Sequence, residues 1–331
     1  MNKDTYSQPL GLDVGTSRIV VARSTDKKYT YESQLNAFLT LPYSKLAESL
    51  LQRENVFHKV EGQEIIVMGN DAERFAEVFH VETRRPMKSG TLNPQEPHSL
   101  VVVKNIIERL VGKPGTEGQK VLFSVPAPLE HGEDGIPYHQ ASIQQVLGEL
   151  GFEATPIAEG LAVVFGELGD SNFTGIGISC GSGLCNVCLA VLSVPVISFS
   201  VPRAGDYIDN HAALVTGDLA IRMRVQKEQG FRLNGFTSDR VQNALSVYYK
   251  EMIKDLVESL RHQISSAQRL PKLEQSIPLV LAGGTSMPKG FLEYFTTALR
   301  INELPVKLSE VRVSADPLNS TARGALMGAL C

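Results

Sequence analysis

Short apolar runs of strand character alternate along the chain with longer segments whose apolar residues have helical spacing. Residues 121–125, 175–178 and 279–282 are short apolar runs and predict buried strands. Residues 100–110 and 240–264 place apolar side chains on one side of a helical repeat and predict helices. Strands that alternate with helices favour α/β sheets covered by helices.

One local pattern occurs in each half of the chain. Residues 9–23 predict a strand, a tight glycine turn and a second strand, and residues 175–192 repeat this plan. A chain of 331 residues can form two domains, because one domain commonly holds about 100–200 residues. The repeated hairpin therefore indicates two related domains.

The composition narrows the class of protein. Hydrophobic residues make up 43% of the chain and charged residues 21%, as in ordinary globular proteins. The net charge is −4 without a block of Lys and Arg, which argues against a nucleic-acid partner. The longest apolar run, 187–199, contains Ser193 and Pro195 and is too short to span a bilayer. The first ten residues lack a secretory signal, so we expect a cytoplasmic protein without a membrane-spanning segment.

Three of the four cysteines, Cys180, Cys185 and Cys188, lie within nine residues, and the fourth is Cys331. Their spacing matches that of plant-type iron–sulfur proteins, with Cys331 as a fourth ligand. On a strand, however, Cys185 and Cys188 point to opposite faces because an odd number of positions separates them. We therefore favour small buried residues on a hairpin over a metal cluster.

Three glycine-bearing turns each follow a strand-like run, at residues 13–16, 180–183 and 283–286. Glycine lets the backbone turn sharply and approach a ligand, and successive N–H groups in such turns form anion cradles. The third turn precedes a predicted helix from Lys289 onward, whose N-terminus favours phosphate. No Walker-type loop and no dinucleotide-binding fingerprint occurs, which disfavours two common phosphate-binding folds.

These turns belong to an ordered set of motifs that resembles the actin-like superfamily, in particular the MreB/ParM-like bacterial actin homologues and the DnaK-type nucleotide-binding domain. The set extends over residues of about 10–328. The segments that carry the resemblance are 11–17, 123–127, 156–162, 178–187, 203–209, 281–287 and 318–327.

The resemblance implies an α/β fold of two ribonuclease-H-like lobes (the actin-like ATPase fold) with a nucleotide cleft between them. The first lobe would comprise residues 1–165 and 317–331, with a small insert at about 31–97. The second lobe would comprise residues 166–316, with a helical insert at about 205–275.

The resemblance also implies ATP or ADP with Mg²⁺ as ligands. Asp13 would hold the metal through water, and Glu228 would accept hydrogen bonds from the ribose hydroxyls. Glu159 would be a structural carboxylate where the lobes connect. The remaining expected nucleotide contacts are Gly15, Thr16, Ser17, Arg18, Gly181, Ser182, Gly183, Gly205, Asp206, Gly283, Gly284, Thr285, Ser286 and Met287.

Two departures from the family pattern predict slow hydrolysis. Ser179 replaces the second aspartate and Leu184 replaces a threonine, so one carboxylate and one hydroxyl are missing. The group that positions the attacking water falls near residues 138–140. His139 and Gln140 are the catalytic candidates beside Asp13, and Glu133 or Asp134 could also reach in.

The first functional reading is an actin-like ATP-binding protein that is a weak ATPase, closes its lobes on the nucleotide and assembles with itself into cytoskeletal filaments. One alternative is a non-polymerising, nucleotide-regulated binding protein of the DnaK type, although the chain ends within the length of the ATPase part. Another alternative is a small-molecule kinase on the same fold, although the insert resembles that of the filament proteins.

Overall fold

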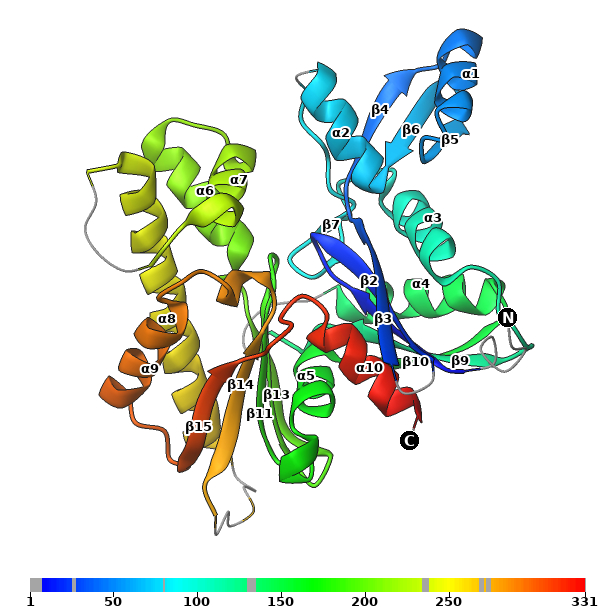
Figure 1. Cartoon of the computed structure of the whole chain (residues 1–331). Coiled ribbons are helices and arrows are strands. Elements are labelled where there is room, and N and C mark those ends of the chain that lie inside the picture. The colour runs from blue at the N-terminus through cyan, green and yellow to red at the C-terminus, as the bar shows by residue number, and fades with distance from the viewer. Residues whose placement is uncertain are drawn as a thin grey trace.

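Two five-stranded sheets form the frame of the molecule (Figure 1). The computed structural model describes residues 8–25, 28–79, 81–129, 135–233, 238–267, 271 and 275–330. Helices cover the sheets and also lie between them, so the predicted α/β class is confirmed.

The first sheet has the strand order β10-β9-β1-β2-β3. Strands β1, β2 and β3 form an antiparallel meander, and β9 and β10 add to β1 in parallel. The bounds of these strands are β1 (Leu10–Val14), β2 (Arg18–Thr25), β3 (Lys28–Leu35), β9 (Gln119–Val125) and β10 (Phe152–Ala158).

The second sheet repeats this topology, with the order β13-β12-β11-β14-β15. Strands β11, β12 and β13 are the meander, and β14 and β15 are the parallel additions. The bounds are β11 (Gly175–Cys180), β12 (Cys185–Val191), β13 (Val194–Val201), β14 (Ile277–Ala282) and β15 (Leu308–Val313). The duplicated hairpin of the sequence is thus the visible part of a fully duplicated sheet.

Helices turn each sheet into a lobe with its own core. In the first lobe, α3 (Ser99–Val111) and α4 (Ile136–Glu149) pack on the first sheet, and their apolar side chains bury Phe123 completely. In the second lobe, the long helix α8 (Arg240–Ser266) and α9 (Phe291–Ile301) pack on the second sheet. These two separate cores make each lobe a stable unit.

Each lobe also carries an insert that rises above its sheet (Figure 1). The first insert contains a three-stranded sheet, and the second contains two helices. The elements of the first are β4 (Phe38–Pro42), α1 (Lys45–Arg53), β5 (His58–Glu61), β6 (Glu64–Met68), α2 (Gly69–Phe79), β7 (Met87–Lys88) and β8 (Thr91–Leu92); those of the second are α6 (Gly205–Thr216) and α7 (Ala220–Gly230).

Two glycine-rich helices, α5 (Glu159–Glu167) and α10 (Ser320–Leu330), cross between the two sheets (Figure 1). A Cβ atom on Gly324 would lie 1.6 Å from the carbonyl oxygen of Ala162. A Cβ atom on Gly160 would lie 2.6 Å from the amide nitrogen of Cys188 in the second sheet. The two lobes therefore meet backbone to backbone, at a separation that only glycine permits.

Several expectations from the sequence can be compared directly with this fold. Cys185 and Cys188 are both buried but belong to different hydrophobic clusters, as the strand period requires. Cys331 lies outside the described residues. Among the described residues, no helix combines the length and the apolar character that a membrane crossing requires. The exact lobe boundaries stay a prediction.

The close contact between α5 and α10 predicts that one methyl group added at Gly324 strongly destabilises the protein. We expect Gly324→Ala to lower the free energy of unfolding by about 2–3 kcal/mol or more, because the opposing atom is backbone and cannot rotate away. The matched control is Gly148→Ala in α4, where a Cβ atom meets nothing within 4 Å. Urea unfolding should show that the control gains up to about 1 kcal/mol. A Gly324→Ala variant that unfolds at the same urea concentration as wild type would contradict the close packing of α10 against α5.

Candidate functional site

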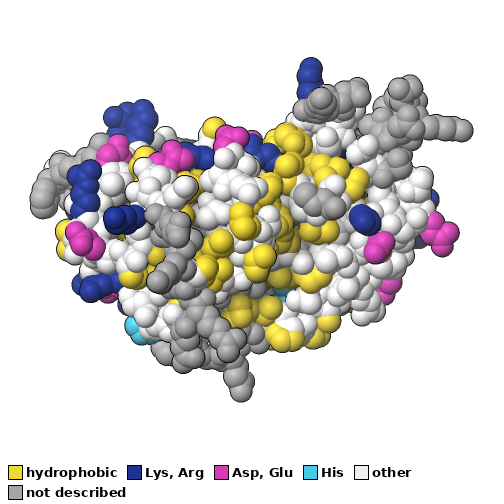
Figure 2. All heavy atoms as spheres, turned by 90° about the horizontal axis from the view of Figure 1, so that it is seen from below, with side chains coloured by type: hydrophobic (Ala, Val, Ile, Leu, Met, Phe, Trp, Pro, Cys, Tyr) yellow, Lys and Arg dark blue, Asp and Glu magenta, His cyan; other side chains and the backbone are white. Residues whose placement is uncertain are grey.

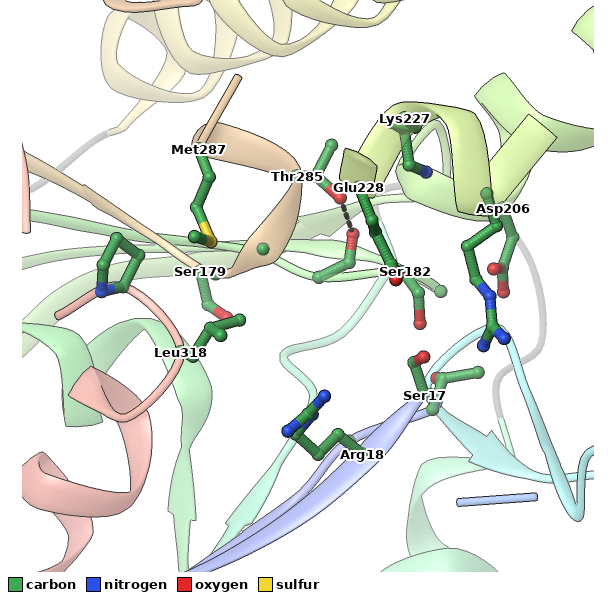
Figure 3. Close-up of a pocket in the computed structure, with 18 of the residues that line it drawn as sticks. Ser17, Arg18, Ser179, Ser182, Asp206, Lys227, Glu228, Thr285, Met287 and Leu318 are labelled. Carbon is green, nitrogen blue, oxygen red and sulfur yellow. Dashed lines mark hydrogen bonds between the residues drawn. The ribbon is translucent and has the colours of Figure 1, made fainter. Parts of the chain in front are cut away.

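A cavity of about 660 Å³ lies between the lobes, and all three glycine turns line it (Figure 3). The sequence places these turns there because each follows a strand of a duplicated sheet, and equivalent strand ends face the same cleft. The predicted residues that line the cavity are Asp13, Gly15, Thr16, Ser17, Arg18, Gly181, Ser182, Gly183, Asp206, Glu228, Gly283, Gly284, Thr285 and Met287.

The turns of the two hairpins touch each other across the cleft. A Cβ atom on Gly183 would lie 2.5 Å from Thr16 Oγ1, which accepts a hydrogen bond of 3.1 Å from the amide of Gly90. Leu184 closes this end, since it is buried and a Cβ atom on Gly90 would meet it at 2.6 Å. Leu184, which stands where the family has threonine, thus has a packing role.

The third turn is joined to the second by side-chain and backbone contacts. Thr285 Oγ1 donates a hydrogen bond of 2.7 Å to the carbonyl of Gly181 (Figure 3). Gly283 has φ +86°, and a Cβ atom there would lie 2.3 Å from the carbonyl oxygen of Cys180. Of the remaining predicted residues, Gly205 lies against Thr285, and Ser286 is buried and bonds back to Gly283. Both support the turn without lining the cavity.

Two carboxylates of the first lobe, Asp13 on β1 and Glu159 at the start of α5, face the cavity. Ser124 Oγ donates a hydrogen bond of 2.7 Å to Asp13 Oδ1, and Ser179 Oγ donates one of 3.0 Å to Glu159 Oε2. Burial raises the pKa of Asp13 to about 6. Burial and the nearby charge of Asp13 raise the pKa of Glu159 to about 8. Such a pair favours a cation, which would stabilise both ionised forms.

The other charged groups of the cavity divide into paired and unpaired ones. Arg85 bonds Asp206 at 2.6 Å, Arg224 bonds Glu73, and Lys227 bonds Asp209 at 2.8 Å. The first two pairs join the insert of the first lobe to the insert of the second. Six charged residues of the lining form no ion pair with any described residue: Arg18, Arg232, Lys289, Asp13, Glu159 and Glu228. Free cations and free carboxylates in one cavity suit a ligand that carries both phosphates and hydroxyls.

The structure does not bring the predicted water-positioning residues to the cavity. His139 lies on the buried side of α4, where burial lowers its pKa to about 4, and neither His139 nor Gln140 is among the lining residues. Glu133 and Asp134 lie outside the described residues. Glu159, expected to be a structural carboxylate where the lobes connect, also lines the cavity. Its position as the first residue of a helix after a parallel strand is the sequence signal for it.

Mg²⁺ is the metal that this donor set fits. Among the described residues, no group of three or more His, Cys, Asp and Glu side chains could enclose an ion. Mg²⁺ usually keeps several waters and takes only one or two carboxylates, together with the oxygens of a phosphate ligand. Asp13, held by Ser124, meets that requirement.

Comparison with known proteins assigns the chain to a family. The family model described as Volactin matches residues 9–329. The chain belongs to the Volactin family. Actin-like protein MamK of Paramagnetospirillum magneticum is 23% identical over 346 residues, which cover 96% of this chain and 90% of MamK.

Two solved structures show the same fold. The MamK double helical filament has a TM-score of 0.72 and 20% identity, and the match covers 98% of both chains. MreB5 of Spiroplasma citri bound to AMPPNP has a TM-score of 0.62 and 13% identity, over 96% of this chain and 94% of that chain. The expected actin-like fold is therefore confirmed.

The raised pKa of Glu159 predicts a pH-dependent cost to stability. Between its ordinary value of 4.5 and about 8, the unfolded chain loses a proton that the folded chain keeps, so stability falls as the pH rises. Glu159→Gln removes this loss. We expect its melting temperature, relative to wild type, to rise steadily from about pH 5 to about pH 9.

Scanning calorimetry across this pH range would test the expectation. The control is Glu153→Gln, which removes the same charge from an exposed position on β10. A difference from wild type that is the same at every pH would show that Glu159 does not carry the titration.

Proposed function

We propose that this chain binds ATP and ADP with Mg²⁺ in the cleft and hydrolyses ATP slowly. The observation that carries the proposal is the convergence, on one interlobe cavity, of three glycine turns and six ionisable side chains that form no ion pair with a described residue. Nucleotide-bound relatives support it: a non-polymerising mutant of MamK and Spiroplasma citri MreB5 have been solved with AMPPNP, and MreB5 also with ADP.

The lining of the cavity fits the parts of such a nucleotide in order. Met287 and Leu318 lie at one end, whereas Ser17, Ser182 and Asp206 lie at the other (Figure 3). The apolar end would hold the base, since flat aromatic rings bind well against apolar side chains. The end with the hydroxyls and backbone amides would hold the phosphates.

Charged side chains complete the assignment. Glu228 would accept the ribose hydroxyls, and Arg18, whose guanidinium projects into the cavity, would contact a phosphate (Figure 3). Asp13 would hold Mg²⁺ through water, and the metal would neutralise charge on the terminal phosphates. Glu159, in the ionised form that a bound cation would favour, would accept the proton of the attacking water in place of His139 or Gln140. Ser179 supplies no second carboxylate for metal-bound waters, which accounts for slow turnover.

Lobe closure would follow from the ion pairs across the mouth of the cleft. Arg85–Asp206 and Arg224–Glu73 join the two inserts. Arg224 is almost fully buried and its Nε atom has no partner among the described residues. Opening of the cleft between the inserts would break both pairs, and the lobes would hinge about the α5–α10 crossing.

Binding of Mg·ATP provides the direct test. Isothermal titration should give a micromolar affinity for wild type and an affinity weaker by about tenfold or more for Asp13→Ala, because the metal loses its carboxylate. Asp170→Ala, at an exposed aspartate that does not line the cavity, is the control and should bind like wild type. Folded wild-type protein that binds neither ATP nor ADP would refute the proposal.

We further propose that the protein assembles head to tail into cytoskeletal filaments in the cytoplasm, as the MamK filament suggests. Exposed apolar residues occur at both ends of the second lobe. Leu214 (79% exposed) lies near the end of α6, and Leu192 (60%) and Val194 (62%) lie at the β12–β13 turn, which points away from the cleft. Figure 2 shows a band of hydrophobic side chains on the lower face. Two different patches at opposite ends produce an open polymer.

The β12–β13 turn is also strained. Leu192 and Ser193 have φ angles of 51° and 71°, which residues other than glycine, asparagine and aspartate rarely adopt. Hydrogen bonds from Leu192 to Thr174 and from Ser193 to the Phe173 carbonyl hold the turn. An exposed leucine at such a position suggests that its side chain contacts a partner.

Leu192→Asn should weaken filament assembly without lowering the stability of the monomer. Asparagine tolerates the left-handed conformation, so the monomer should unfold like wild type or at slightly higher denaturant. The concentration needed for pelleting with Mg·ATP should rise by about tenfold or more if the side chain contributes about 1.4 kcal/mol to the contact.

Val247→Asn is the control for Leu192→Asn, because Val247 is 52% exposed on the outer helix α8. It should pellet at the wild-type concentration. If Leu192→Asn pellets like wild type, the β12–β13 turn is not part of the contact.

A further inference from the structure

The duplicated sheets place Ser179 at the position that corresponds to Asp13. Each residue is next to last in the first strand of its meander, and a glycine turn follows. Asp13 is opposite Val20 on β2, whereas Ser179 is opposite Asn186 on β12. Directly opposed residues of an antiparallel pair share one face of the sheet. The second lobe therefore presents a hydroxyl and an amide where the first presents a carboxylate and a valine.

Ser179 and Asn186 of the second lobe both interact with one side chain, that of Glu159. Ser179 Oγ donates to Glu159 Oε2 at 3.0 Å, and the side chain of Asn186 also lowers the pKa of Glu159. Ser179 and Asn186 are 4% and 1% exposed, so water does not compete for these bonds. Asn186 Oδ1 in turn accepts a bond of 2.8 Å from the amide of Ala127, in the loop after β9 of the first lobe.

We propose that Ser179, with Asn186, is a positioning residue that fixes the Glu159 carboxylate relative to the terminal phosphate. This inference rests on the proposed ATP hydrolysis. In that step, the water oxygen forms a bond to the terminal phosphorus while the bond to the ADP oxygen breaks. The proton of the water passes to Glu159 and then to the released phosphate. Ser179 touches neither water nor phosphate in this role, and acts only through Glu159.

The hydrogen bond from Ser179 to Glu159 gives a physical reason for a serine at position 179. A carboxylate at residue 179 would be the third one beside Asp13 and Glu159, in a buried site where like charges oppose ionisation. A hydroxyl donates to Glu159 instead and favours its ionised form. The second lobe thereby lacks a carboxylate that would orient metal-bound waters, and supplies instead a hydroxyl that fixes the proton acceptor of the first lobe.

The test compares wild type with Ser179→Ala, Ser179→Thr and Ser179→Cys in single-turnover and steady-state phosphate release. We expect Ser179→Ala to lower kcat by about 10- to 100-fold, because a misplaced catalytic group costs rate rather than binding. KM for ATP and the Mg²⁺ concentration for half-maximal rate should stay unchanged. Ser179→Thr keeps the hydroxyl and should restore kcat to within about threefold, whereas Ser179→Cys keeps the volume with only a weak donor and should remain slow.

Ser198→Ala is the matched control, since Ser198 Oγ is also buried and has no partner among the described residues. It should leave kcat unchanged. If Ser179→Ala fails to fold, Ser179→Cys carries the comparison.

Three results would overturn the inference. A Ser179→Ala protein with wild-type kcat would remove the positioning role while leaving the proposed function intact. A Ser179→Ala protein that needs more Mg²⁺ but reaches wild-type kcat would make Ser179 a support for the metal. Wild-type protein that binds Mg·ATP but releases no phosphate would overturn the hydrolysis itself, and this failure is visible before any variant is made.

Discussion

The backbone contact between α5 and α10 is the constraint on which the rest of the structure depends. Gly324 lies directly against the Ala162 carbonyl, and Gly160 lies against the backbone of the second sheet. Because side chains are absent at these points, the two sheets come close enough for their hairpin turns to touch as well. The cavity is therefore a consequence of a steric condition satisfied at its base.

Inside that cavity, burial disfavours the ionised forms of the carboxyl groups, and hydrogen bonds from serine hydroxyl groups partly offset this effect. Asp13 accepts a hydrogen bond from Ser124 on the neighbouring strand β9, and Glu159 accepts one from Ser179 on β11 of the other sheet. The basic and acidic residues at the mouth are neutralised by one another across the inserts, whereas those nearer the turns are left for a ligand. The distribution of pairing thus separates the residues that join the two inserts from the residues that face the cavity without an ion-pair partner among the described residues.

Local patterns in the sequence were sufficient for the strands, the glycine turns and most of the cavity lining. Each turn is coded by residues that are adjacent in the chain, so Gly15, Gly181 and Gly283 could be identified without the fold. His139 and Gln140 failed because their placement depends on how α4 rotates against the sheet, which puts His139 in the core. No local pattern identifies the ion pairs of Glu73, Arg85 and Arg224, because the partners lie more than a hundred residues apart in the chain.

The position of the helix crossing also determines how motion is passed through the molecule. The crossing is at the base of the cleft, and the inserts with their ion pairs are at the far end (Figure 1). A small rotation about such a pivot becomes a large displacement at the tips, as in a lever. The end of α6 at the exposed Leu214 is carried on one of those arms, so a small change of angle near the pivot becomes a large displacement of this part of the surface.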